Sequence, residues 1–270
     1  MELIDTHCHL NHAAFDADRV AVQTRARAAG VAQMLCISYD LVSSRRAAAL
    51  ANTEPGLYAA IGIHPESAQE WDEAARAELR ALYHSSPARM TAYGEIGLDY
   101  HWETIPRAAQ QTVFAEQIAF AATLSPLLPL IIHCRDAFDD TLAVLRDSHT
   151  QNPVVMHCFG GDLAAAEACL NAGYYLGIGG VATFKKSDAL RTALVSVPLE
   201  RLLLETDCPY LAPQPWRGKR NEPSYLLAVA QTLAAVKNVS IETIAVVITL
   251  VAISSVSIQR TLFFWPLAII

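Results

Sequence analysis

The stretch Leu-Ile-Asp-Thr-His-Cys-His, residues 3–9, places two histidines at the end of an apolar run near the start of the chain. We predict a β-strand over residues 3–7. Alternate residues of a strand point to the same face, so His7 and His9 are expected to project together from its carboxyl end. Two neighbouring imidazoles are good ligands for a transition metal. The alternative is that the two histidines occur together by chance. Other residues of the chain have to decide between a metal site and a chance pair.

Seven further apolar runs of strand length follow, at residues 33–38, 58–63, 91–96, 130–134, 154–158, 174–178 and 202–205. The segments between them are rich in Ala, Leu, Glu and Arg and predict helices over residues 16–29, 43–52, 72–83, 106–124, 137–147, 162–172 and 188–197. Eight strands that alternate with helices are typical of an α/β fold, the (β/α)8 TIM barrel. A doubly wound open sheet is the competing fold, but it needs a GxGxxG phosphate loop, which the chain lacks.

Length and composition favour one domain over residues 1–270, because the chain has 270 residues of which 53% are hydrophobic. The net charge of −7, from 20 basic and 27 acidic residues, argues against nucleic-acid binding by a general basic surface. A phosphate ester would have to be held locally, by metal ions and a few basic side chains.

The six cysteines are scattered without a CxxC pair, and the first residues do not resemble a signal peptide. We therefore expect a reducing, cytoplasmic compartment. Cys8, Cys134 and Cys158 each adjoin a candidate ligand histidine. Because neighbouring residues of a strand face opposite ways, we expect these thiols to pack away from the metal, with ligation as the alternative.

The last part of the chain, from Thr243 to Ile270, carries Arg260 as its only charge. A membrane span needs about 20 mainly apolar residues, so one span is conceivable here. The many hydroxyl groups and Pro266 favour a packed terminal helix instead. We expect no stable association with a membrane.

Acids and histidines recur where the predicted strands end, and all these ends open at one mouth of a barrel. The candidate metal ligands are His7, His9, Glu95, His133, His157 and Asp207. Such a set is large enough for two divalent cations. A carboxylate has two oxygens and can bridge both ions, which makes Glu95 the bridging candidate. His7, His9 and Asp207 would complete one site, and His133 and His157 the other. Two ions about 4 Å apart can stabilise the attacking and leaving oxygens of a displacement at phosphorus.

These motifs resemble those of the TatD family of metal-dependent deoxyribonucleases, within the wider amidohydrolase-like barrels. The matching stretches cover residues 5–10, 62–65, 94–100, 133–137, 157–159, 205–213 and 217–223. They occur in the family's order and span roughly residues 3 to 245. The set as a whole is specific, although no single block is.

The resemblance implies a divalent-metal-dependent hydrolase that cleaves DNA phosphodiester bonds from a 3′ end, with single-stranded DNA or 3′ ends as partner. It implies two metal ions, with Mg, Mn and Zn as candidates, and catalytic roles for Glu95 and Asp207. Glu205 would orient or deprotonate the attacking water. His64 and Arg135 match positions that contact substrate phosphate. Hydrolysis of another ester or an amide, such as aminoacyl-tRNA, is the alternative function, because a fold does not determine a substrate.

Several residues keep two interpretations. Asp5 is either a hydrogen-bond partner of a ligand imidazole or a strand-end turn residue. Arg135 contacts phosphate or pairs with Asp99 or Asp136. The loop cations Arg217, Lys219 and Arg220 steer phosphate or are simply solvated. The aromatic residues at 100–102 offer surfaces for base stacking or serve packing.

The chain departs from the family's pattern over residues 246–270, where an apolar segment replaces the usual polar turn and the helix that ends in Arg-Leu-Phe. The departure leaves every proposed ligand in place. It affects the packing of the last helix rather than the expected chemistry.

Overall fold

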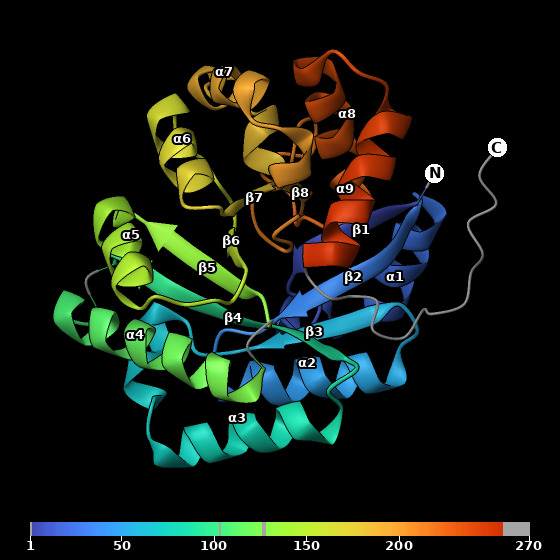
Figure 1. The fold of residues 1–270 in the computed structure, drawn as a ribbon. Helices are drawn as coiled ribbons and strands as arrows, with labels where there is room; N and C mark the ends of the chain where they lie inside the picture. The colour runs from blue at the N-terminus through green and yellow to red at the C-terminus, as the bar shows by residue number, and fades with distance from the viewer. Residues whose placement is uncertain (1, 103, 126–127, 256–270) are drawn as a thin grey trace.

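The computed structural model describes residues 2–102, 104–125 and 128–255, and these form one sheet of eight parallel strands in the order β1 to β8. The strands are β1 Leu3–Cys8, β2 Val31–Ile37, β3 Leu57–Ile61, β4 Met90–Asp99, β5 Leu130–Arg135, β6 Val154–Met156, β7 Tyr175–Ile178 and β8 Leu202–Leu204. The helices are α1 Arg19–Ala28, α2 Leu41–Thr53, α3 Glu73–Ser85, α4 Arg107–Leu124, α5 Phe138–Asp147, α6 Leu163–Asn171, α7 Asp188–Ser196, α8 Leu226–Lys237 and α9 Ile241–Ser255. The helices surround the strands on the outside (Figure 1).

The last strand returns to the first. The hydroxyl of Thr6 donates a hydrogen bond to the carbonyl of Leu204 at 3.0 Å. Beyond β8, the amide of Asp207 donates to the carbonyl of His7, and the amide of His9 donates to the carbonyl of Cys208, both at 2.8 Å. The predicted (β/α)8 barrel is therefore confirmed.

All eight predicted strands and all seven predicted helices are present, with boundaries that differ by a few residues. Several helices begin one residue after the predicted aspartate, because that aspartate is the N-cap. Asp72 accepts a hydrogen bond from the amide of Ala75 at 2.8 Å, and Asp162 accepts one from Ala165 at 3.0 Å. Strand β4 runs three residues beyond the prediction, to Asp99, because it continues to pair with β5 as far as Arg135.

Inside the barrel, alternate residues of the strands form an apolar layer. Its buried members are Ile4, Leu35, Ile37, Tyr58, Ala60, Ala92, Ile131, Val155 and Leu203. Two residues further along their strands or just past the strand ends come His133, His157 and Glu205. Because a strand repeats every two residues, the same inward direction that buries the apolar layer directs polar side chains above it.

Helix α9 covers the barrel at the opposite end from these polar residues. Ile244 and Ile248 on this helix are buried, and Val251 and Ala252 join the apolar layer. The hydroxyl of Thr249 bonds to the carbonyl of Glu2, just before β1, at 3.2 Å. The part of the predicted packed terminal helix that the structure describes is therefore confirmed, whereas residues 256–270 lie outside the described residues.

The described residues contain no single helix that is long and apolar enough to cross a membrane. Taken together, residues 223–237 and 241–249 have sufficient length and composition, but the two segments are bent by 107°.

We expect Ile248→Ala to destabilise the fold by about 2–5 kcal/mol, because the truncated side chain leaves a cavity between α9 and the barrel. Ile248 is 2% exposed, whereas Val246 on the same helix is 60% exposed. Val246→Ala is the matched control and should change the free energy of unfolding by less than about 0.5 kcal/mol. Urea unfolding of both variants measures the difference. Equal losses would show that α9 does not pack as described.

Candidate metal centre

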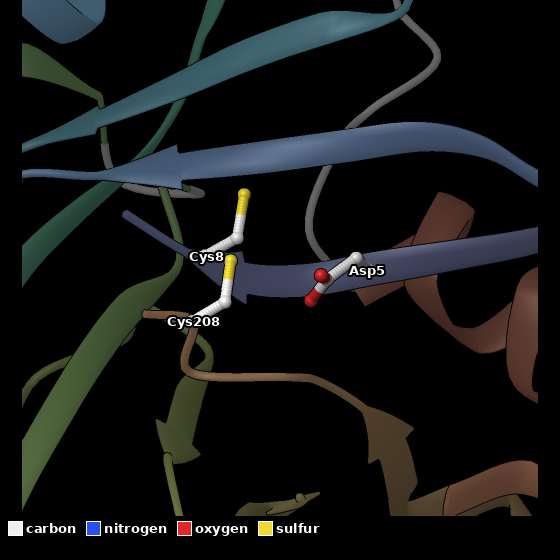
Figure 2. Close-up of side chains that lie close together, drawn as sticks. All are labelled: Asp5, Cys8 and Cys208. Atoms are coloured by element: carbon white, nitrogen blue, oxygen red, sulfur yellow. The ribbon is translucent and has the colours of Figure 1, made fainter. Parts of the chain in front are cut away.

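The end of β1 directs its side chains to two sides. The thiol of Cys8 donates a hydrogen bond to the carbonyl of Leu35 at 3.3 Å and points away from the two histidines that flank it. Cys208, which follows Asp207, lies beside it, and both residues are fully buried (Figure 2). Cys8 therefore packs as the strand alternation predicts.

Asp5 lies near these two thiols, and its carboxylate binds Thr206 and the backbone amide of His7 rather than the imidazole of a ligand. Its carboxylate accepts hydrogen bonds from the Thr206 hydroxyl at 2.6 Å, the Thr206 amide at 3.0 Å and the His7 amide at 3.3 Å. Burial raises the pKa of Asp5 to about 7, although the bonds from Thr206 oppose this. Asp5 thus ties the first strand to the segment that carries Asp207, which favours the structural alternative for this residue.

The opposite side of β1 faces a cavity of about 720 Å³ at the carboxyl ends of the strands. The cavity is lined by His9, Tyr39, His64, Glu66, Ser67, Glu95, Asp99, Trp102, His133, Cys134, Arg135, His157, Cys158, Asp207, Tyr210 and Leu211. The described residues therefore bring the predicted ligands together at one barrel mouth, although they are up to 200 positions apart in the chain.

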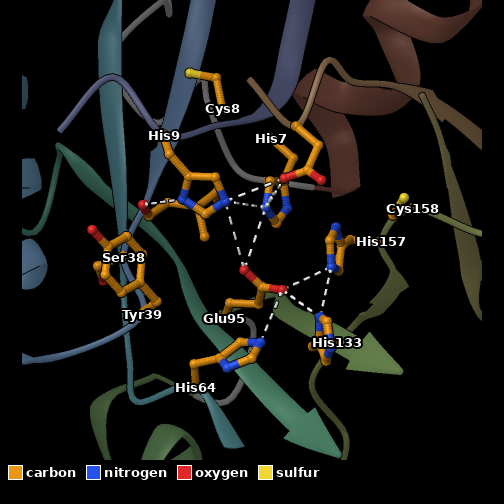
Figure 3. A network of polar contacts seen from close by, with 12 residues as sticks. His7, Cys8, His9, Ser38, Tyr39, His64, Glu95, His133, His157 and Cys158 are labelled. Atoms are coloured by element: carbon orange, nitrogen blue, oxygen red, sulfur yellow. Dashed lines mark hydrogen bonds and ion pairs between the residues drawn. The ribbon is translucent and has the colours of Figure 1, made fainter. Parts of the chain in front are cut away.

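Glu95 lies at the centre of this group, and its two carboxylate oxygens face different histidines (Figure 3). Oε2 is 3.5 Å from Nε2 of His7 and 3.8 Å from Nε2 of His9. Oε1 is 2.8 Å from Nδ1 of His133 and 2.7 Å from Nε2 of His157. Each oxygen thus belongs to its own cluster of nitrogen ligands, which is the arrangement a bridging carboxylate requires.

The first cluster contains His7, His9 and Asp207. The Nε2 atoms of the two histidines are 3.2 Å apart, and Oδ1 of Asp207 is 3.3 Å from His9 and 3.7 Å from His7. Nδ1 of His9 lies 3.0 Å from the carbonyl of Ile37. Since a carbonyl only accepts, Nδ1 carries a hydrogen at this contact, which leaves Nε2 as the atom of His9 that could bind a metal.

The second cluster contains His133 and His157, whose Nδ1 and Nε2 atoms are 3.2 Å apart. The other ring nitrogen of His133, Nε2, is 2.9 Å from Oδ2 of Asp99. Asp99 therefore orients His133, a role that the sequence prediction missed. The signal was available, because Asp99 comes four residues after Glu95 in a motif at the end of β4, and a metal-ligating imidazole commonly bonds to a carboxylate.

Glu205 lies behind His157 rather than in the cavity. Its Oε1 atom is 3.6 Å from Nδ1 of His157 and accepts a hydrogen bond from the amide of Cys158 at 2.6 Å. Glu205 is fully buried and does not line the cavity. Gly177 leaves room for this carboxylate, because a Cβ atom there would lie 2.1 Å from Oε2.

The donor set fits divalent metal ions. Nitrogen and oxygen ligands bind zinc at about 2.0–2.2 Å, so ligand atoms around one ion lie roughly 3–3.5 Å apart. Including Glu95, the separations in the first cluster are 3.2–3.8 Å, close to this spacing. In the second cluster the two histidine nitrogens are 3.2 Å apart, and Oε1 of Glu95 lies 2.7 and 2.8 Å from them.

The two acidic ligands are ionised in this environment. Burial acts to raise the pKa of Glu95, but the charge of His157 and the hydrogen bonds from the surrounding imidazoles hold it well below its ordinary value. Burial likewise acts to raise the pKa of Asp207, but the hydrogen bond from His9 together with the charges of the nearby histidines outweighs burial, so that the pKa of Asp207 is lowered. Both residues can therefore supply the negative charge that a divalent cation needs.

The predicted phosphate contacts divide into two groups. His64 is buried, 3.8 Å from Oε1 of Glu95, and burial together with the charge of His133 lowers the pKa of His64 to about 3. Arg135 lines the cavity and makes no ion pair with any described residue, so the alternative of pairing with Asp99 or Asp136 is not observed.

The loop cations Arg217, Lys219 and Arg220 do not line the cavity. Arg220 donates to the carboxylate of Asp18 at 2.7 and 2.9 Å, and the guanidinium of Arg217 lies 4.1 Å from the ring centre of Phe184. The expected contact of these three residues with substrate therefore stays a prediction.

The other two cysteines beside ligand histidines lie closer to the cavity than Cys8 does. Cys134 and Cys158 border the cavity. Strand alternation does not determine the orientation of Cys158, because β6 ends at Met156 and Cys158 has a φ of +47°. Neither thiol belongs to a described group of residues that could hold a metal, so packing remains the better interpretation.

Comparisons with known proteins identify the family to which this chain belongs. The model of the TatD-related DNases matches residues 4–255. A Bacillus subtilis protein described as an uncharacterized metal-dependent hydrolase, YabD, is 40% identical over 244 residues, covering 90% of this chain and 94% of the relative. A 3′-5′ ssDNA/RNA exonuclease, TatD, of Cronobacter turicensis is 40% identical over 230 residues, covering 83% and 86%. The crystal structure of YjjV, a TatD homolog from Escherichia coli K12, has a TM-score of 0.87 and 30% identity, covering 93% of this chain and 96% of that one. The resemblance seen in the sequence is thus confirmed, and the chain belongs to the TatD-related DNase family of metal-dependent hydrolases.

Proposed function

We propose that this protein is a 3′-to-5′ exonuclease that hydrolyses single-stranded DNA with two divalent metal ions bridged by Glu95. The observation that carries the proposal is the division of the Glu95 carboxylate, with Oε2 toward His7 and His9 and Oε1 toward His133 and His157. The similar Cronobacter protein is named as a 3′-5′ ssDNA/RNA exonuclease, which supports nucleic acid as the substrate.

Each ligand has an assigned place in the proposed centre. His7, His9 and Asp207 would hold one ion, His133 and His157 would hold the other, and Glu95 would contribute to both. Bound divalent ions lower the pKa of water and stabilise charge on the attacking and leaving oxygens at phosphorus. The ionised state of Glu95 and Asp207 supports this assignment. The histidine-rich set suits Zn or Mn, and the carboxylates also allow Mg.

The remaining residues act on the substrate or through a ligand. His64 and Arg135 border the cavity and are assigned to the phosphate. Since the Glu205 carboxylate is 3.6 Å from Nδ1 of His157 and does not border the cavity, we assign it to positioning His157 rather than to direct contact with the attacking water. Arg217, Lys219 and Arg220 would reach only a more distant part of a longer strand.

Treatment with EDTA should abolish release of nucleotides from the 3′ end of a labelled single-stranded DNA, because the centre contributes its chemistry only with metal. Adding back Mg, Mn or Zn separately should restore the release for at least one ion. Elemental analysis of the purified protein identifies the resident metal and its number per chain. Undiminished nucleotide release after exhaustive chelation would contradict the proposal.

Glu95→Ala and Asp207→Ala should each lower the rate of DNA hydrolysis by more than about a hundredfold, since loss of a residue that only orients a ligand already costs about 10- to 100-fold. The control is Glu73→Ala, which removes a carboxylate that is 90% exposed at the start of α3. Rates are measured on DNA and, side by side, on small carboxylic esters and amides. Faster turnover of the ester or amide by the wild type would favour the alternative hydrolase.

Asp99→Asn should weaken metal binding by about 10- to 100-fold, because the hydrogen-bond partner of His133 becomes neutral. Asp136→Asn is the matched control, as this aspartate lies near the same barrel mouth but is 65% exposed and bonded to His101. Titration of the chelated protein with Zn or Mn, followed by calorimetry, measures both affinities. The role of Asp99 would be refuted by identical affinities of the two variants.

A further inference from the structure

The rim of the cavity carries a large aromatic side chain that the metal chemistry does not use. Trp102 lines the cavity and is 55% exposed. Tryptophan is highly buried on average in folded proteins, so a half-exposed indole beside a catalytic cavity needs an explanation. Tyr100, two residues earlier, differs, because it is buried and its hydroxyl bonds to Asp140 at 2.8 Å. Tyr100 thus serves packing, while Trp102 leaves much of its surface available.

The register of two neighbouring strands places a cation beside this indole. Asp99 at the end of β4 pairs with Arg135 at the end of β5, and Trp102 follows Asp99 by three residues. The guanidinium carbon of Arg135 is 5.4 Å from the centre of the Trp102 ring. Among the described residues that line the cavity, Arg135 is the one Lys or Arg side chain. It makes no ion pair with them, so its charge is available to an anion.

An aromatic surface next to a guanidinium that forms no ion pair with the described residues matches the chemistry of a nucleotide, which joins a flat base to an anionic phosphate. We propose that Trp102 and Arg135 form a nucleotide subsite at the cavity rim, in which Trp102 stacks on an unpaired base while Arg135 binds the adjoining phosphate. This inference rests on the proposed function, because the phosphate next to the stacked base leads to the ions at Glu95.

Two further aromatic residues line the cavity beside the first metal cluster, and one of them, Tyr210, is 49% exposed. Tyr39 and Tyr210 pack against the imidazole of His9, with ring centres 5.7 and 6.0 Å from it and planes inclined at 66° and 72°. We assign these two rings to the wall around the first metal cluster.

The subsite selects unpaired bases for a steric reason. Five of the six proposed ligands, all except His133, are between 0% and 8% exposed. A phosphate therefore has to enter the cavity to reach them. A cavity of about 720 Å³ lies within the range of roughly 300–1,000 Å³ typical of small-molecule sites, which suits a single nucleotide. A base loses the stacking energy of its neighbours when it enters the cavity, and stacking on an aromatic side chain of the protein compensates this loss.

The test measures binding rather than turnover. A 5′-fluorescein-labelled single strand carries phosphorothioates at its last linkages to resist hydrolysis, and a second strand is identical but lacks the bases of its last two nucleotides. Fluorescence anisotropy with the metal-loaded protein should show about tenfold tighter binding of the strand with bases. Trp102→Ala should bring this ratio close to one, and Trp102→Phe should retain most of it.

Two further variants distinguish the contribution of base stacking to the affinity from that of phosphate binding. Arg135→Gln should weaken both strands alike and reduce the salt dependence of binding by about one charge, leaving the ratio unchanged. Trp216→Ala is the control for loss of an indole, because Trp216 stacks on Tyr225 at 4.2 Å and does not line the cavity. The Trp216 variant should keep the wild-type ratio.

The proposal is overturned if the wild type does not distinguish the two strands, or if Trp102→Ala keeps the full preference. Circular dichroism of each variant verifies the fold, which loss of a half-exposed side chain should not disturb. A preference for bases without cleavage of an ordinary phosphodiester strand would refute the exonuclease proposal while supporting the subsite.

Discussion

A buried carboxylate enclosed by imidazoles is the constraint on which the rest of the structure depends. Glu95 is 4% exposed, and an isolated ionised carboxylate at such a position would cost many kcal/mol. Its neighbours compensate the charge from both sides, His7 and His9 toward one oxygen and His133 and His157 toward the other. Because these residues come from β1, β4, β5 and the end of β6, the charge is compensated only when the barrel has closed. The site and the fold therefore depend on each other.

The strand geometry explains how one barrel combines a dry interior with a polar mouth. Ile131 and Val155 belong to the apolar layer, and His133 and His157 follow them by two residues, so each pair projects inward at successive levels. Helix α9 adds Val251 and Ala252 to the lower end of that layer. Water is thus excluded from below the site, which strengthens electrostatic interactions among the groups above it.

The parts of the centre that sequence could predict are those governed by local periodicity. The pair His7 and His9 follows from strand alternation, and Glu95 follows from its place at a strand end. Prediction failed where position depends on distant partners. Asp99 becomes an orienting residue because β4 continues to pair with β5 as far as Arg135. Strand alternation does not determine where Cys158 points, because β6 has already ended at Met156. Tertiary contacts decide such cases, and single-sequence patterns do not contain them.

The charges around the cavity indicate why substrate attraction and metal occupancy are linked in this protein. Four carboxylates line the cavity, those of Glu66, Glu95, Asp99 and Asp207, against the single guanidinium of Arg135 among the described lining residues. Without ions this surface repels a phosphate, in keeping with the net charge of −7. Two divalent cations would add four positive charges at the floor and reverse the sign of the local potential. Ions bound there would recruit an anionic substrate as well as activate water, and an acidic protein would then need no basic surface to act on nucleic acid.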